Sequence, residues 1–226
     1  MNSTTNTRHH ATRTFQGKIA CAGSHEPERR RANPARSRRM TQGRGCALRA
    51  PLYGGGMTQL TDPLSLRSGA SMKNRFALAP LTNLQSPDEG VLSDDELRWL
   101  SMRAEGGFGL VMTCAASVQA EGVGFPGQLG FHHDKHVPRL ALLADQVKRQ
   151  GALAIAQLHH GGLRALKNPK APSADEKLKA EAMTLDEIAH TRDCFIAAAR
   201  RAEQAGFDGV ELHGAHGYLI CSFLSP

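Results

Sequence analysis

The 226-residue sequence contains no hydrophobic run long enough to cross a bilayer, which takes about 20 apolar residues. It has five cysteines, an odd number, and no Cys-x-x-Cys pair, so we expect neither a disulfide framework nor a zinc ribbon. Its N-terminal arginines are not followed by the apolar core of a signal peptide. These absences favour a reducing compartment, and we predict a cytoplasmic location without membrane attachment.

Acidic residues are scarce in residues 1–56, and this scarcity accounts for the net charge of +7. The segment holds 11 of the 28 Lys and Arg residues but only 2 of the 21 Asp and Glu residues, which leaves 17 basic and 19 acidic residues in 57–226. The part from Met57 on therefore carries a net charge of −2. The charge of the whole chain thus does not predict nucleic acid as a partner of the folded part.

Residues 1–56 show little periodic hydrophobicity and are rich in Arg, Ser, Thr, Asn and Gly. Such a segment cannot bury enough apolar surface to offset the entropy of ordering it, so we predict a disordered basic extension. A nucleic-acid-binding arm and an organelle transit peptide are alternatives, although no aromatic residues interleave the basic clusters. We favour an extension translated from an upstream start codon, because Met57 directly precedes the first patterned residues.

From Met57 on, short apolar segments alternate with segments of helical periodicity. The predicted strands are 76–81, 109–113, 153–158 and 209–213, the last of them buried. Ser93 with Glu96 and Thr184 with Glu187 form capping-box patterns that open two helices, and a third helix covers 137–150. We expect the polar stretch 164–182 to be an exposed insertion and 218–224 to begin another helix.

Each predicted helix has an apolar face for the core. The expected core residues are Leu97, Leu100 and Ala104, with Trp99 and Met102 beside them, in the first helix; Leu140, Leu143, Ala144 and Val147 in the second; and Ile188, Phe195, Ile196, Ala199 and Ala202 in the third.

The strand–helix alternation predicts a parallel sheet with right-handed crossovers. A doubly wound open sheet would carry a Gly-rich phosphate loop after its first strand, and residues 79–83 do not form one. We therefore predict an α/β protein of the (β/α)8 TIM barrel type, with about the first four β/α units in 57–226.

Polar side chains follow three of the predicted strands, and in a barrel these strand ends meet at one face. The first strand ends in 79–83, the third in Gln157 with His159 and His160, and the fourth in His213. His213 and His216 lie three residues apart across a Gly-Ala turn, a spacing that lets both imidazoles point at one oxygen.

Two other interpretations of this histidine pair remain open. The pair can be unrelated core or surface histidines, or it can be two metal ligands. Glu211, or His159 and His160, would then complete the ligand set, so a metal-dependent hydrolase that uses His213 and His216 is a second enzyme class.

Four motifs, in order, resemble the N-terminal half of the Old Yellow Enzyme family, the FMN-dependent ene-reductases also called NADH:flavin oxidoreductases. They are 74–82 with Asn74-Arg75 and Ala79-Pro80-Leu81-Thr82, 105–113, 157–162, and 213–219 with 223–226. The resemblance implies an enzyme that passes hydride from NAD(P)H through FMN to the activated C=C bond of an α,β-unsaturated carbonyl compound.

The resemblance also implies roles for particular residues. His213 and His216 would bind the carbonyl oxygen of the substrate, and Tyr218 would give a proton to the neighbouring carbon, a role that suits a phenol because phenols are protonated at neutral pH. The residues that would hold FMN are Ala79, Pro80, Leu81, Thr82, Ala115 and Gln157. We expect no metal, no nucleic acid and no membrane as partners, and leave a homo-oligomer open.

In the resembling family, four more strand–helix units follow the residues that match Ser225 and Pro226, and the last two hold the phosphate of FMN. The alternative to an active ene-reductase is therefore a truncated, catalytically inactive half-barrel.

Overall fold

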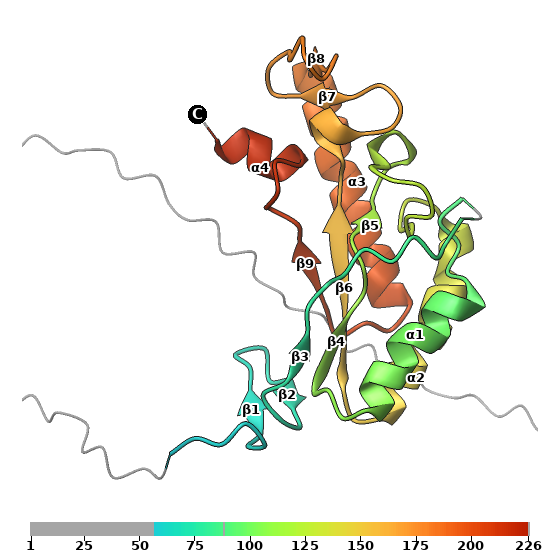
Figure 1. Cartoon of the computed structure of the whole chain (residues 1–226), viewed down its shortest axis with the longest axis vertical. Helices are drawn as coiled ribbons and strands as arrows, with labels where there is room; N and C mark the ends of the chain where they lie inside the picture. The colour runs from blue at the N-terminus through green and yellow to red at the C-terminus, as the bar shows by residue number, and fades with distance from the viewer. Residues whose placement is uncertain (1–56, 88, 226) are drawn as a thin grey trace, which may run out of the picture. The chain divides into compact units, whose positions relative to one another are not determined.

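A computed structural model describes residues 57–87 and 89–225 (Figure 1). The predicted disordered extension, residues 1–56, lies outside them. In chain order the elements are β1 (Leu64–Ser65), β2 (Ser71–Met72), β3 (Ala77–Leu78), α1 (Asp94–Glu105), β4 (Leu110–Met112), β5 (Ala116–Ser117), α2 (Val137–Arg149), β6 (Leu153–His159), β7 (Lys170–Ala171), β8 (Glu181–Ala182), α3 (Leu185–Gln204), β9 (Gly209–Leu212) and α4 (Leu219–Leu224). In the described ranges, no helix is both long and apolar enough to cross a membrane.

The parallel sheet is built around β6, the longest of its strands. β6 pairs with β4 and β5 on one side and with β9 on the other, while β3 pairs with β4. All of these pairings are parallel, as the alternation of strands and helices predicts. Helices α1, α2 and α3 lie on one face of the sheet (Figure 1). The antiparallel hairpin of β1 and β2 was not predicted.

β4 and β5 pair with the same side of β6, and the segment between them is one residue longer than the part of β6 that it faces. Met112 pairs with Ile155 and Ala116 pairs with Leu158, so three residues of one strand face two of the other. Within this bulge, the Thr113 hydroxyl accepts the N–H of Gln157 at 3.0 Å, in place of a backbone carbonyl. The side chain thus keeps the ladder satisfied where the bulge interrupts it.

The core faces of α1 and α2 are those that the periodicity predicts. Their expected residues are all buried, with exposed fractions of 0 to 7%: Leu97, Leu100, Ala104, Leu140, Leu143, Ala144 and Val147. Trp99 is partly buried against them. Met102 is 47% exposed, so its predicted packing is wrong. Two residues after Leu100, it projects roughly 200° further round the helix, on the far side from the core.

The buried stripe of α3 differs from the predicted one. Its buried residues are Thr191, Ala198 and Ala202, and Ile196 is 43% exposed. Ile188, Phe195 and Ala199 are only partly buried. The helix packs against β6 and β9 through small side chains, so the larger apolar residues lie to the side of the contact. The prediction of Ile196 as a core residue is therefore wrong.

Two further expectations need correction. The stretch 164–182 is largely exposed, but β7 and β8 pair within it and bury Ala171 and Ala180. The fourth predicted strand, β9, is not buried, since Val210 and Leu212 are 38% and 57% exposed. Among the residues that the structure describes, β9 pairs only with β6 and so forms an edge of the sheet.

Glu96 stabilises the amino end of α1 in a way that the capping-box pattern does not predict. Ser93 caps the helix through the N–H of Glu96, but the Glu96 carboxylate is fully buried. It accepts hydrogen bonds from the Ser86 hydroxyl at 2.5 Å and from the Cys114 thiol at 3.0 Å. Burial, with the Glu96 charge beside it, raises the pKa of the Cys114 thiol. In α3, by contrast, both hydrogen bonds of the predicted capping box of Thr184 are present.

Replacing Glu96 with Ala should lower the free energy of unfolding by about 2 to 4 kcal/mol, because it leaves two buried donors without an acceptor. Glu96→Gln keeps the volume and one acceptor oxygen, so it should cost less. Urea denaturation of both variants and of the unmodified chain measures the difference. Equal midpoints for all three proteins would contradict this role of Glu96.

Candidate active site

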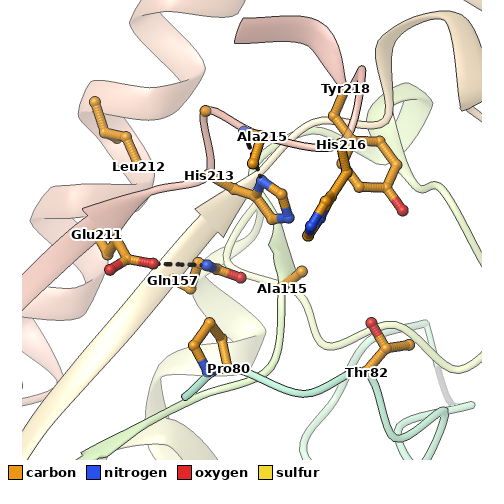
Figure 2. Close-up of a pocket in the computed structure, with 11 residues that line it drawn as sticks. Pro80, Thr82, Ala115, Gln157, Glu211, Leu212, His213, Ala215, His216 and Tyr218 are labelled. Atoms are coloured by element: carbon orange, nitrogen blue, oxygen red, sulfur yellow. Dashed lines mark hydrogen bonds between the residues drawn. The ribbon is translucent and has the colours of Figure 1, made fainter. Parts of the chain in front are cut away.

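A cavity of about 350 Å³ lies at the carboxyl ends of the sheet strands (Figure 2). It is lined by Pro80, Thr82, Ala115, Gln157, Glu211, Leu212, His213, Gly214, Ala215, His216 and Tyr218. Seven of the nine predicted site residues are thus brought together here. The other two, Ala79 and Leu81, are exposed residues of the β3 loop outside this lining.

The floor of the cavity contains an amide–carboxylate pair. The Gln157 Nε2 donates to Glu211 Oε1 at 2.7 Å, and the two residues are partners in the pairing of β6 with β9 (Figure 2). A carboxylate only accepts, so this bond fixes the Gln157 Nε2 towards Glu211 and turns the Gln157 oxygen away from it. The sequence predicts a role for Glu211 only as a possible metal ligand, and its hydrogen bond to Gln157 was not predicted.

The ring of His213 is oriented by its own loop. The backbone N–H of His213 donates to the carbonyl oxygen of Leu158 at 2.9 Å and so continues the strand pairing past β9. The ring Nδ1 of His213 accepts the backbone N–H of Ala215 at 3.3 Å. With Nδ1 as acceptor, the neutral ring carries its proton on Nε2 and can donate there. Burial, reinforced by His216 nearby, lowers the pKa of His213, which favours this neutral form.

A tight turn brings His216 and Tyr218 beside His213. His216 has a φ of +59° and Gly217 a φ of +70°, and the turn is closed by the Tyr218 N–H, which donates to Ala215 O at 3.2 Å. Non-glycine residues with positive φ are uncommon, and they concentrate at functional sites. The ring centroids of His213 and His216 are 5.2 Å apart, and both rings extend into the space opposite Pro80, Ala115 and Thr82 (Figure 2).

The ring of Tyr218 lies between several other groups. Its centroid is 4.3 Å from that of the buried His159 and 5.1 Å from that of His213, both edge to face. The Arg164 guanidinium lies 5.8 Å from the ring centre. His160, although adjacent to His159, does not line this cavity, and its Nδ1 accepts the N–H of Gly162 at 3.0 Å. Of the two neighbouring histidines, only His159 therefore contacts the Tyr218 ring.

The metal interpretation can be tested against the ligand geometry. In the ranges that the structure describes, no three or more His, Cys, Asp or Glu side chains lie together as a metal ion would need. Cys114, Cys194 and Cys221 are free thiols. The hydrolase alternative thus has no ligand set in that part of the chain.

The sequence model of the NADH:flavin oxidoreductase / NADH oxidase family matches residues 59–226. The chain belongs to this family. The probable NADH-dependent flavin oxidoreductase YqiG of Bacillus subtilis is 39% identical over 176 residues, which are 74% of this chain and 47% of that protein. The NADPH dehydrogenase of Bacillus pumilus is 38% identical over 176 residues, 75% of this chain and 52% of that protein. The chain spans about half the length of these curated relatives.

Solved structures of the family have the same fold. An Old Yellow Enzyme from a Pichia species superimposes with a TM-score of 0.69 at 28% identity, over 74% of this chain and 48% of that chain. The Old Yellow Enzyme homologue from Zymomonas mobilis superimposes with a TM-score of 0.65 at 33% identity, over 72% of this chain and 50% of that chain. The prediction of about four units of a (β/α)8 barrel is thus confirmed. The predictions of an oxidoreductase, of FMN and of NAD(P)H are confirmed for the family.

The lining of the cavity fits the ring system of FMN better than its phosphate. The Gln157 amide and the Thr82 hydroxyl can hydrogen-bond the polar edge of a flavin, and the small Ala115 and Pro80 leave room for a flat ring. The residues that line the cavity include no Lys or Arg to bind a phosphate. This lining can therefore accommodate a flavin ring but supplies no basic side chain for a phosphate.

Buried neutral histidines should make the stability of this fold fall in mild acid. Burial lowers the pKa of His136 and of His160 to about 4 and that of His159 to about 3. In an unfolded chain each value is about 6.5, so below that pH the unfolded state binds protons that the folded state does not. The free energy of unfolding is therefore highest above about pH 6.5 and falls towards pH 4, by up to roughly 1.4 kcal/mol per pH unit for each histidine.

Urea unfolding at pH 7 and at pH 5 measures this effect, with a lower midpoint expected at pH 5. His160→Gln should make the dependence on pH less steep, since it removes one of the buried histidines that resist protonation. A midpoint that rises on acidification would contradict the assignment.

Proposed function

We propose that this chain provides the substrate-side half of an FMN-dependent ene-reductase site, which reduces the C=C bond of an α,β-unsaturated carbonyl compound. The observation that carries the proposal is the convergence of His213, His216 and Tyr218 on the cavity that Gln157 and Thr82 also line. When bound, FMN supplies the hydride, which it takes from NAD(P)H.

His213 and His216 would hold the carbonyl oxygen of the substrate. His213 presents an Nε2–H, because its Nδ1 is used by the Ala215 N–H, and His216 lies beside it on a turn of fixed geometry. Negative charge grows on this oxygen as the neighbouring C=C bond receives hydride. Two donors already in place stabilise that charge more than they stabilise the uncharged substrate, and this difference lowers the barrier.

Tyr218 would give its hydroxyl proton to the carbon next to the carbonyl group. Its ring is held edge to face by His159 and His213, and its backbone N–H closes the turn that carries His216. The proton donor and the oxygen-binding residues therefore belong to one short segment, which fixes their relative positions.

The names of two relatives support an activated alkene as substrate. The NADH:acrylate oxidoreductase of Vibrio harveyi is 36% identical over 183 residues, and the NADH:fumarate oxidoreductase of Klebsiella pneumoniae is 34% identical over 179. Acrylate and fumarate both carry a C=C bond conjugated to a carboxyl group. These relatives are longer, since the chain covers only 18% and 19% of them.

The inactive half-barrel remains the alternative, favoured by the lack of Lys and Arg in the cavity lining. The visible absorption spectrum of the purified chain with added FMN, after gel filtration, distinguishes the two. A retained flavin band supports a working site, whereas a colourless protein supports the alternative. The cytoplasmic location and the oligomeric state stay predictions.

Tyr218→Phe should slow the reduction of an alkene such as cyclohexenone by at least about 100-fold, because it removes the proton donor and little else. The oxidation of NAD(P)H that reduces FMN should change less than about twofold, since it does not use this proton. Stopped-flow spectroscopy of the flavin-loaded protein separates the two half-reactions. An equal loss in both would contradict the role.

His216→Asn should retain more alkene reduction than His216→Ala. Asn tolerates a positive φ and keeps an N–H donor, whereas Ala lacks the donor and is strained at +59°. We expect a loss of roughly tenfold for Asn and 100-fold or more for Ala, on the order of one lost oxyanion donor. Equal rates for the two variants would show that His216 does not donate to the substrate.

A further inference from the structure

The imidazole of His159, at the carboxyl end of β6, is fully buried beside the site. Its ring meets that of Tyr218 edge to face, at 4.3 Å and 82°, and lies 5.3 Å from that of His213. Phe125 approaches it from the loop after β5, with ring centroids 6.1 Å apart. His159 thus packs against both the proposed proton donor and one of the proposed oxygen-binding residues.

Gln128 determines the protonation state of this ring. Its Oε1 accepts the N–H of Gly124 at 2.8 Å, and its Nε2 donates to the carbonyl oxygen of Ala115 at 2.8 Å. A backbone N–H can only donate and a carbonyl can only accept, so the amide has one possible orientation. The same Nε2 lies 2.8 Å from His159 Nδ1, and this Nδ1 must therefore be the acceptor.

A ring whose Nδ1 accepts is neutral and carries its proton on Nε2. A proton on His159 Nδ1 would point at the N–H of Gln128 Nε2, and two donors would then face each other without an acceptor. Burial lowers the pKa of His159, and His213 and His160, the ionisable groups acting on it in the described part of the chain, lower it further. In that part of the chain, Nε2 has no hydrogen-bond partner.

We propose that Gln128 locks His159 as the neutral Nε2–H tautomer, and that this ring is a positioning residue that holds Tyr218 and His213 in place. A ring that titrated near neutral pH would bring a positive charge against His213 whenever it took up a proton. A locked ring gives the same packing and the same charge at every working pH. The inference rests on the proposed role of Tyr218, but its tests do not use catalytic activity.

The tautomer can be measured directly on the whole chain labelled with ¹⁵N-histidine. Long-range ¹H–¹⁵N correlation spectra between about pH 5 and 8 show which ring nitrogens carry protons. We expect His159 to remain the Nε2–H tautomer throughout, while in urea the same histidine titrates near 6.5. An Nδ1–H tautomer, or an imidazolium within this range, would overturn the proposal.

Gln128→Glu tests the cause of the lock. A carboxylate accepts from Nδ1–H, so His159 should begin to titrate between about pH 5 and 8, with a midpoint raised by roughly two pH units or more. Gln146→Glu is the matched control, because the charge change is the same and Gln146, on α2, accepts the hydroxyl of Ser101 on α1, away from His159. An unchanged His159 in the Gln128 variant, or an equal change in the control, would overturn the lock.

Two variants of His159 test its effect on Tyr218. His159→Asn keeps an acceptor for Gln128 but removes the ring, whereas His159→Phe keeps the ring and removes the acceptor. We expect the Tyr218 ring signals to move towards their unfolded-chain positions in the Asn variant and to be largely restored in the Phe variant. Tyr218 signals that stay unchanged in the Asn variant would show that His159 does not position this ring. Tyr218→Phe kinetics test the proposed function separately.

Discussion

The hydrogen bonds that β6 makes on both of its sides place the candidate site. β4 and β5 pair with it on one side and β9 on the other, and the ladder continues past β9 through the N–H of His213. Parallel strands end at the same edge of a sheet, so Ala115, Gln157 and His213 meet although the chain separates them widely. A register slip of one residue along β6 would turn Gln157 and its partner Glu211 away from each other.

The parts of the site that follow strand ends were predictable from the sequence. The alternation of strands and helices places Pro80, Thr82, Gln157 and His213 at one edge, and the family resemblance adds Tyr218. Local spacing also gives the N-caps at Ser93 and Thr184 and the buried stripes of α1 and α2. These features depend on residues close together in the chain, whose pattern reflects a period of two or 3.6.

The remaining features depend on pairings between distant residues, which leave no periodic pattern. Nothing in the sequence pairs Gln157 with Glu211, Gln128 with His159, or Glu96 with Cys114. Glu96 shows the difficulty, because its position three residues after Ser93 fits a capping box, yet its carboxylate is used in the core. The exposure of β9 was missed for another reason, since an apolar strand does not reveal whether it has one neighbour or two.

The cavity is lined by four separate segments: the loops after β3 and β4, the second half of β6, and β9 with the loop that follows it. Any ligand that fills it must bind all four at once, so its binding free energy opposes the local opening of each. The loops would then share a common resistance to opening that they lack individually. A bound ligand would thus link the strand–helix units at the carboxyl ends of their strands, beyond the last hydrogen bonds between the strands.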